Sequence, residues 1–181
     1  MASEYLLSLI NDVLDMSKLD SGEMYFAEES VYLREMLENC RDIMETRAVE
    51  HGIELETPGL ENFNPPRVLT SELHIRQIAM NIISNAIKYN KPNGKIIATA
   101  EVVNQTEDYV TCRFMVKDTG IGMSDDFQKN MFDPFSQEYG KDRSEFRGTG
   151  LELSIVKRIV DQMGGEIRVE SKKGVGTTFT W

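Results

Sequence analysis

The chain has 181 residues, of which 40% are hydrophobic and 28% are charged, and its formal net charge is −10. A chain of this length and composition can bury one hydrophobic core with a short appendage. The acidic balance argues against a nucleic-acid surface, which needs Lys and Arg to neutralise phosphates. No apolar run approaches the roughly 18 residues of a membrane span, so we expect this piece to be soluble and to make no membrane contact. The two cysteines, Cys40 and Cys112, lie far apart in apolar patterns, which predicts buried thiols without a disulfide in a reducing cytosol, and so a cytoplasmic location.

The first predicted element is a helix over residues 4–20. Ile10, Val13 and Leu14 repeat at helical spacing and fall on one stripe, and the helix is expected to end near Gly22. An exposed apolar stripe needs a partner surface, so we expect this helix to pack in a bundle.

The remainder alternates short strands with longer helices. Strands are expected near 24–27 and 53–57, in a hairpin over 95–103 and 109–117, and in a last hairpin over 166–170 and 177–181. Helices are expected over 31–50, 71–89, 124–131 and 151–163, with Ser30 and Ser124 as N-caps. The polar run 133–147 lacks periodicity and is expected to form a mobile loop.

The helix over 71–89 carries a polar face. Asn81, Asn85 and Lys88 follow at i, i+4 and i+7 and share that face, while isoleucines and alanines supply the opposite, buried one. An Asn carbonyl is a hard oxygen ligand that suits Mg²⁺, and a lysine offers a point charge to phosphate. One face is therefore expected to pack and the other to bind a ligand.

The strand over 109–117 ends in Asp118-Thr119-Gly120-Ile121-Gly122-Met123. Its alternating apolar residues point inward, so the Asp118 carboxylate is expected to emerge at the edge of the sheet. The two glycines permit a close turn, and Ile121 and Met123 provide apolar walls.

Three further segments complete the pattern. Phe132 and Phe135 flank a proline at the start of the polar loop, and glycines surround Thr149 immediately before the last long helix. Backbone N–H groups at such a helix N-terminus bind phosphate. The segments are Phe132-Asp133-Pro134-Phe135, Gly148-Thr149-Gly150-Leu151 and Gly174-Val175-Gly176-Thr177-Thr178-Phe179.

Five segments in this order resemble the N, G1, F, G2 and G3 boxes of the sensor histidine kinase ATP-binding domain, which is related to gyrase, Hsp90 and MutL. The resemblance covers nearly the whole chain. It implies an α+β fold, a two-layer α/β sandwich with a mixed sheet packed on three helices. It also implies a division into residues 1–22, the C-terminal helix of the dimerisation and phosphotransfer domain, and residues 23–181, the catalytic ATP-binding domain.

The resemblance further implies the roles of individual residues. Asn85 would hold Mg²⁺, Asp118 would accept the adenine amino hydrogen, and Asn81, Asn85 and Lys88 would be the catalytic residues. The implied nucleotide-binding set is Asn85, Lys88, Tyr89, Asp118, Gly120, Ile121, Gly122, Met123, Phe132, Phe135, Gly148, Thr149, Gly150, Leu151 and Thr177. Which of the loop cations Lys141, Arg143 and Arg147 reaches phosphate is left open.

The implied activity is transfer of the γ-phosphoryl group of ATP to a histidine on a helix outside this chain. The implied partners are that helix, a response-regulator receiver domain and a second copy of the full-length protein. The parent protein would be a hybrid kinase, and an anchor in the inner membrane elsewhere in it is left open.

Three departures from the family pattern bear on this interpretation. Asn81 stands where gyrase-like ATPases have a Glu that serves as general base, which favours phosphoryl transfer over hydrolysis. Neither His51 nor His74 has the context of a phosphoacceptor, so the isolated chain is not expected to phosphorylate itself. Glu152 replaces a glycine in the G2 segment, and its carboxylate is expected to compete with phosphates at the helix N-terminus.

Other functions remain as alternatives. Glu152 favours a nucleotide-binding regulatory module with little or no kinase activity. A serine-kinase anti-sigma factor is disfavoured by the leading bundle helix. A purely structural dimerisation piece has no use for five nucleotide-binding segments.

Overall fold

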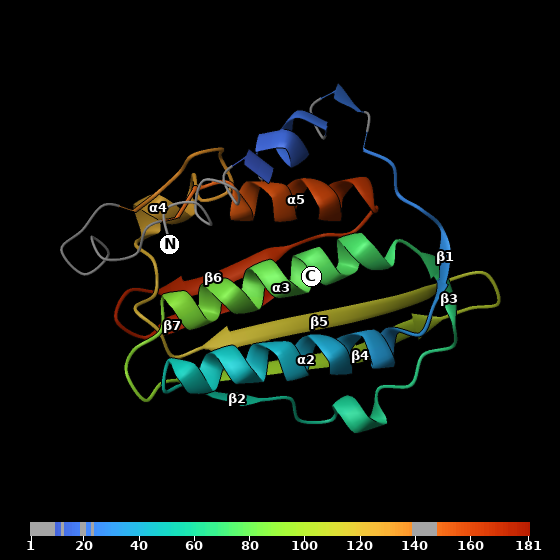
Figure 1. Ribbon diagram of the computed structural model, residues 1–181, viewed down its shortest axis with the longest axis horizontal. Helices are drawn as coiled ribbons and strands as arrows, with labels where there is room; N and C mark the ends of the chain where they lie inside the picture. The colour runs from blue at the N-terminus through green and yellow to red at the C-terminus, as the bar shows by residue number, and fades with distance from the viewer. Residues whose placement is uncertain (1–9, 12, 19–20, 23, 139–147) are drawn as a thin grey trace.

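The protein is a two-layer α/β sandwich. The computed structural model describes residues 10–11, 13–18, 21–22, 24–138 and 148–181. Three helices, α2 (Leu33–Glu50), α3 (Glu72–Lys88) and α5 (Glu152–Gln162), cover one face of a sheet (Figure 1). The α+β architecture predicted from the sequence is confirmed.

The main sheet has five strands in the order β2-β4-β5-β7-β6. The pairing of β2 with β4 is parallel and the other pairings are antiparallel, so the sheet is mixed. β5 lies at its centre, and its residues alternate between exposed positions and positions that face the helices. The strands are β2 (Glu54–Glu56), β4 (Lys95–Gln105), β5 (Val110–Asp118), β6 (Arg168–Lys172) and β7 (Gly176–Thr180).

The core lies between the sheet and the helices. Helix α5 buries Ile155, Val156, Ile159 and Val160, which recur at helical spacing, and α3 buries a similar stripe. These side chains meet inward residues of β5 such as Val116. Burial of each large aliphatic side chain contributes about 1.5–3 kcal/mol, which holds α3 and α5 against each other and against the sheet.

A second, two-stranded sheet joins β1 (Glu29–Val31) to β3 (Val68–Thr70). The strand expected at 24–27 is therefore wrong: pairing begins at Glu29, where a partner strand is available. Ser30 is not an N-cap, because it lies within β1, and Tyr32 caps α2 instead without a side-chain hydrogen bond. The expected cap at Ser124 is confirmed, since its Oγ accepts from Phe127 N–H at 3.2 Å at the start of α4 (Asp125–Gln128).

The N-terminal segment is helical at residues 10–11 and 13–18 and packs on the helical layer near α5 (Figure 1). Met16 is buried in the main core, and the Asp15 carboxylate accepts a hydrogen bond from Gln77 of α3 at 2.9 Å. Ile10, Val13 and Leu14 remain exposed. The boundary at residue 22 stays a prediction. None of the described helices is long and apolar enough to cross a membrane.

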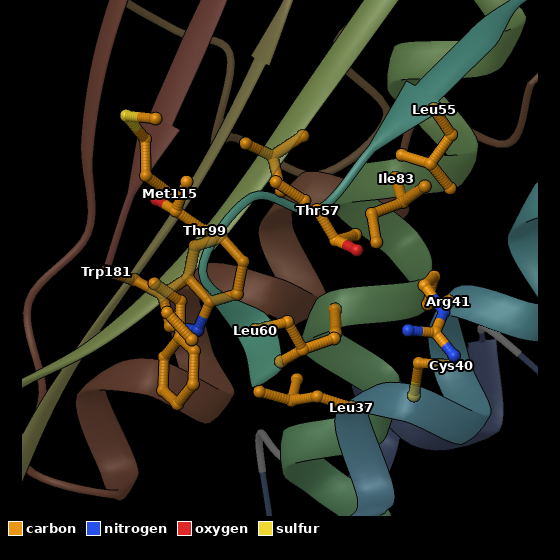
Figure 2. A pocket seen from close by; sticks show the side chains of 15 residues that line it. Leu37, Cys40, Arg41, Leu55, Thr57, Leu60, Ile83, Thr99, Met115 and Trp181 are labelled. Carbon is orange, nitrogen blue, oxygen red and sulfur yellow. The ribbon is translucent and has the colours of Figure 1, made fainter. Parts of the chain in front are cut away.

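A small, mostly apolar pocket lies between α2, α3 and the sheet, and Phe114, Met115 and Val116 of β5 line part of it (Figure 2). Its volume is about 40 Å³, and Leu37, Cys40, Leu60 and Trp181 are among the side chains around it. Cys40 and Cys112 are free, and burial raises the pKa of both thiols.

Candidate nucleotide-binding site

The polar face of α3 opens away from the core. Asn81, Asn85 and Lys88 are half-buried, whereas Ile82 and Ala86 between them are buried. Among the described residues, neither Asn81 nor Asn85 has a side-chain hydrogen-bond partner. The amide groups are thus available to a ligand.

The C-terminal end of α3 touches the loop that follows β5. The Tyr89 carbonyl accepts a hydrogen bond from Ile121 N–H at 3.0 Å. Gly120 passes so close to the same carbonyl that a Cβ on it would overlap the oxygen, so only glycine fits there. The N and G1 segments, separated by about 30 residues in the sequence, therefore form one surface.

Asp118 is buried at the end of β5, with 9% of its surface exposed. Its Oδ1 accepts hydrogen bonds from Gly120 N–H at 2.8 Å and from Thr177 N–H at 3.2 Å. These two donors come from the G1 and G3 segments and fix the plane of the carboxylate. A buried carboxylate that is held by backbone donors is a pre-organised hydrogen-bond acceptor for a flat, polar ring.

The loop 119–123 is fixed along its length. Met123 is buried in the main core, and its N–H donates to Ser171 Oγ at 2.9 Å. Ile121 is half-buried, and its carbonyl accepts from Gly174 N–H at 2.7 Å. Gly122 has a φ of 64° beside the Lys172 carbonyl. The β6–β7 turn thus forms one wall of the loop.

Asn90 and Thr119 were not among the predicted site residues, yet they connect its parts. Asn90 is buried. Its Oδ1 accepts hydrogen bonds from Lys91 N–H at 2.9 Å and from Thr119 Oγ1 at 3.3 Å. Its Nδ2 donates to the Lys95 carbonyl at 3.4 Å. Thr119 Oγ1 accepts from Lys95 N–H at 2.9 Å. The network ties the end of α3 to the start of β4 and to the loop after β5. A polar residue just after a helix gives no distinctive sequence signal, so the pattern did not reveal it.

The predicted phosphate-binding groups meet at Gly148. A Cβ on Gly148 would lie 2.5 Å from Lys88 Nζ, 3.4 Å from Glu152 Oε1 and 3.5 Å from the Tyr89 hydroxyl. The Lys88 ammonium also lies 4.9 Å from the centre of the Tyr89 ring, a cation–π contact. The N and G2 segments therefore come together around one glycine at the N-terminus of α5.

The residues on each side of the polar loop are joined at its base. Gln137 Nε2 donates to the Gly148 carbonyl at 2.6 Å, and a Cβ on Gly150 would lie 2.8 Å from the Phe135 carbonyl carbon. Phe132 packs on the core, but Phe135 is 64% exposed and has a φ of 63°. The loop residues Lys141, Arg143 and Arg147, and the expected mobility of 139–147, lie outside the described residues.

Thr149 and Leu151 contribute mainly through the backbone. Thr149 Oγ1 accepts from Leu151 N–H at 3.2 Å, and the Leu151 side chain is fully buried in the core. The Thr149 N–H donates to Glu152 Oε1 at 3.4 Å. Leu151 therefore anchors the start of α5 rather than offering a side chain to a ligand.

The candidate site offers few carboxylate ligands to a metal ion. The described residues contain no group of three or more His, Cys, Asp or Glu side chains that could hold one. An ion that takes one amide oxygen and completes its shell with water and phosphate oxygens still fits, and Mg²⁺ binds in that way. Asn85 suits this role by its chemistry.

Residues 70–181 match the family described as "Histidine kinase-, DNA gyrase B-, and HSP90-like ATPase". The chain belongs to this ATPase family. The resemblance seen in the five segments is thereby confirmed.

Relatives of this family member include sensor kinases. GacS of Pseudomonas syringae pv. syringae is 38% identical over 98% of this chain and 19% of its own length. Hybrid signal transduction histidine kinase B of Dictyostelium discoideum is 34% identical over 100% of this chain and 9% of its own length. LuxQ of Vibrio harveyi is described as an autoinducer 2 sensor kinase/phosphatase. It is 35% identical over 98% of this chain and 21% of its own length. The chain thus spans about a fifth or less of these relatives.

Solved structures of histidine kinases share the fold. Full-length ShkA in complex with AMPPNP superposes with a TM-score of 0.81 and 31% identity, covering 99% of this chain and 35% of that one. A nucleotide-free catalytic domain of histidine kinase ThkA superposes with a TM-score of 0.64 and 27% identity. The match covers 87% of this chain and 93% of that one. The near-complete cover of the ThkA domain indicates that most of this chain corresponds to a histidine kinase catalytic domain.

The two histidines of this ATPase family member have structural partners. His51 Nδ1 lies 2.8 Å from the Arg47 carbonyl at the end of α2. His74 is buried, its Nδ1 lies 2.6 Å from Ser71 Oγ, and its ring packs on Phe26 at 4.2 Å. Burial lowers the pKa of His74, against the opposing field of Asp15.

Proposed function

We propose that the chain is the ATP-binding catalytic domain of a hybrid sensor histidine kinase, which transfers the γ-phosphoryl group of ATP to a histidine on a separate helix. The observation that carries the proposal is the buried Asp118 carboxylate, held by the N–H groups of Gly120 and Thr177. Membership of the ATPase family and the sensor-kinase relatives support it.

Asp118 recognises the base. Its carboxylate accepts the adenine amino hydrogen, while Ile121 and Met123 contribute apolar surface around the ring. Desolvating a carboxylate without giving it a partner is costly, and a buried site built to accept a hydrogen bond therefore discriminates against bases that lack the donor. Gly120 allows the ring to approach the backbone.

Lys88 and the start of α5 recognise the phosphates. The Lys88 ammonium supplies a positive charge beside Gly148, and the backbone at 148–150 offers its N–H groups as the helix begins. Mg²⁺, when bound to Asn85 and to the nucleotide, neutralises charge on the phosphates. Catalysis by these residues consists mainly of positioning and charge neutralisation.

Asn81 favours transfer over hydrolysis. Its amide side chain cannot take a proton from water, so the site has no general base at that position. The acceptor is then the imidazole of a phosphoacceptor helix in the parent kinase, which we propose to be a homodimer that passes the phosphoryl group to a receiver domain. The parent protein is proposed to present this domain to the cytoplasm.

A second candidate is a nucleotide-binding regulatory module with little or no kinase activity. Glu152 favours it, because its carboxylate lies at the helix N-terminus where phosphates would bind. Transfer assays separate the two candidates, since both require nucleotide binding.

Calorimetry tests nucleotide binding. ADP and ATP should bind with a component that EDTA removes, and Asp118→Asn should weaken both by about 1.5–3 kcal/mol, about tenfold or more, because the amide presents a donor to the adenine amino group. Asp108→Asn, at the exposed tip of the β4–β5 hairpin, is the control. Unchanged affinity in Asp118→Asn would contradict the assignment of the base pocket.

Phosphoryl transfer is tested with labelled ATP. The chain alone should acquire no acid-labile label, and addition of the phosphoacceptor helices of GacS should give labelled histidine on the added protein. Label on His51 or His74 would contradict the proposed division of roles. Nucleotide binding without transfer to any supplied phosphoacceptor helices would favour the regulatory module.

A further inference from the structure

The carboxylate of Glu152 turns back toward the start of its own helix. Oε1 accepts from the Thr149 N–H at 3.4 Å, and Thr149 Oγ1 accepts from the Leu151 N–H at 3.2 Å. This is only the glutamate half of a capping box, because Leu151 and not Thr149 is the N-cap of α5 and makes no side-chain cap hydrogen bond. The backbone that leads into α5 therefore already interacts with an anion from its own chain.

The same carboxylate shares its surroundings with Lys88. The position that a Cβ of Gly148 would take lies 3.4 Å from Glu152 Oε1 and 2.5 Å from Lys88 Nζ. The carboxylate and the ammonium thus lie on the same side of Gly148, around the position that a Cβ would take. Glu152 is near both groups that the proposed function assigns to phosphate, the Lys88 ammonium and the amides at the start of α5.

A phosphate that enters this space must meet the carboxylate. It gains the Lys88 charge and the helix N-terminus only if Glu152 turns away or if the two anions remain close together. A turn of Glu152 away from the helix weakens nucleotide binding because the contact with Thr149 is lost. If the carboxylate stays, repulsion weakens binding, and the repulsion grows with each phosphate charge near the carboxylate. Adenosine, which has no phosphate, is unaffected.

We propose that Glu152 is a specificity-determining residue that disfavours ATP relative to ADP by competing with the terminal phosphate. The inference rests on the proposed function, because it requires adenine at Asp118 and phosphates at Lys88. It extends that function by giving the chain a residue that sets the preference between the two nucleotides. A lower preference for ATP raises the ratio of ATP to ADP that is needed to load the domain with ATP.

The expected effect of the Glu152 charge on nucleotide affinity follows from Coulomb's law. One unit charge about 6 Å from another changes affinity about threefold when fully screened by water and more than a hundredfold at an effective dielectric constant of 20. Glu152 is half-buried, so we expect about a tenfold gain in ATP affinity when the charge is removed. The gain for ADP should be smaller, and adenosine should show none.

Calorimetry on the 181-residue chain tests the proposal with ATP, ADP and adenosine, each at low and high salt. Glu152→Gln removes the charge and keeps an oxygen that accepts from Thr149, and Glu152→Gly also removes the side chain. The matched control is Glu35→Gln, which neutralises the exposed first-turn acid of α2. The ratio of ATP to ADP affinity should rise in both Glu152 variants and stay constant in the control, and added salt should reduce the difference.

The outcomes separate this inference from the proposed function. An unchanged ratio of ATP to ADP affinity in both variants, with nucleotide binding still dependent on Asp118, would overturn the role of Glu152 and leave the proposed function standing. Equal gains for ATP and adenosine would also overturn it, because a purely structural effect acts on all ligands alike. Failure of every adenine nucleotide to bind both the unsubstituted chain and the folded Glu152→Gln variant would overturn the proposed function itself, whereas failure in the variant alone would overturn the role of Glu152.

Discussion

The two ends of the candidate nucleotide site are held by different means. At the base end, defined here as Asp118, Gly120 and Thr177, a buried carboxylate is fixed by backbone N–H groups from two segments. At the phosphate end, defined as Lys88, Gly148 and Glu152, charged side chains meet around a glycine. The base end therefore depends on the fold, and changes there affect stability and binding together. The phosphate end depends on side-chain charge, so a single substitution can alter its selectivity and leave the fold intact.

The largest effect is expected from Gly176→Ala, which tests whether the base end depends on the backbone. Gly176 has a φ of 144°, and a Cβ on it would overlap the Asp118 carbonyl oxygen. Strain and overlap together should cost about 3 kcal/mol or more in the free energy of unfolding. Urea denaturation measures this.

Gly174→Ala is the matched control, because Gly174 also has a positive φ, 80°, but nothing lies within 4 Å of its added Cβ. It should cost only about 1–2 kcal/mol. Equal losses in the two variants would mean that the close approach to Asp118 contributes nothing.

Asn90→Ala tests whether the side-chain network is needed to join α3 to the base end. The variant removes the buried amide of Asn90 and with it the hydrogen bonds to the exposed Thr119 and the half-buried Lys95. We expect a loss of about 1–3 kcal/mol in the free energy of unfolding and a parallel loss of ADP affinity. Asn104→Ala, at an exposed position of β4, should change stability by no more than about 0.5 kcal/mol. Full ADP affinity in Asn90→Ala would show that the loop keeps its position without the network.

The smallest effect is expected from Phe135→Gly, beside the phosphate end. Phe135 is exposed at a φ of 63°, so glycine relieves backbone strain while little packing is lost. Stability should rise by no more than about 1 kcal/mol. Asn93→Gly is the control, because Asn93 has a similar φ of 59° and asparagine tolerates it. A loss of stability above 1 kcal/mol in Phe135→Gly would indicate packing that the exposure of this side chain does not suggest.

The sequence predicted the long elements and the layer order well, because burial follows periodicity in them. The stripe on α5 and the alternation on β5 are each imposed by one buried face, and both were expected within a few residues. The small β1–β3 sheet was missed. Its strands are three residues long and depend on pairing between segments about 40 residues apart, which no local pattern encodes.

Only the part of the candidate site that lies in local motifs was predicted from the sequence. Asp118 and Gly148 stand in motifs, so their place could be inferred before their contacts were known. Asn90 and Ser171 connect those motifs by hydrogen bonds that exist only after folding. The turn of the Glu152 carboxylate toward Lys88 likewise depends on how α3 and α5 pack, although its competition with phosphate was expected from the helix N-terminus.

Trp181 gives the protein an optical reporter that is independent of the nucleotide site. It is the only tryptophan of the chain, its ring stacks on Phe114 with centroids 5.6 Å apart, and its backbone pairs with the same residue. Phe114 lies four residues before Asp118 on β5, about 13 Å along the strand. Tryptophan emission therefore follows unfolding of the sheet and the α2 layer, with little direct influence from adenine at the other end of the strand. Fluorescence melting curves with and without ADP thus give the binding energy of each variant as a shift in stability, with no dye or label added.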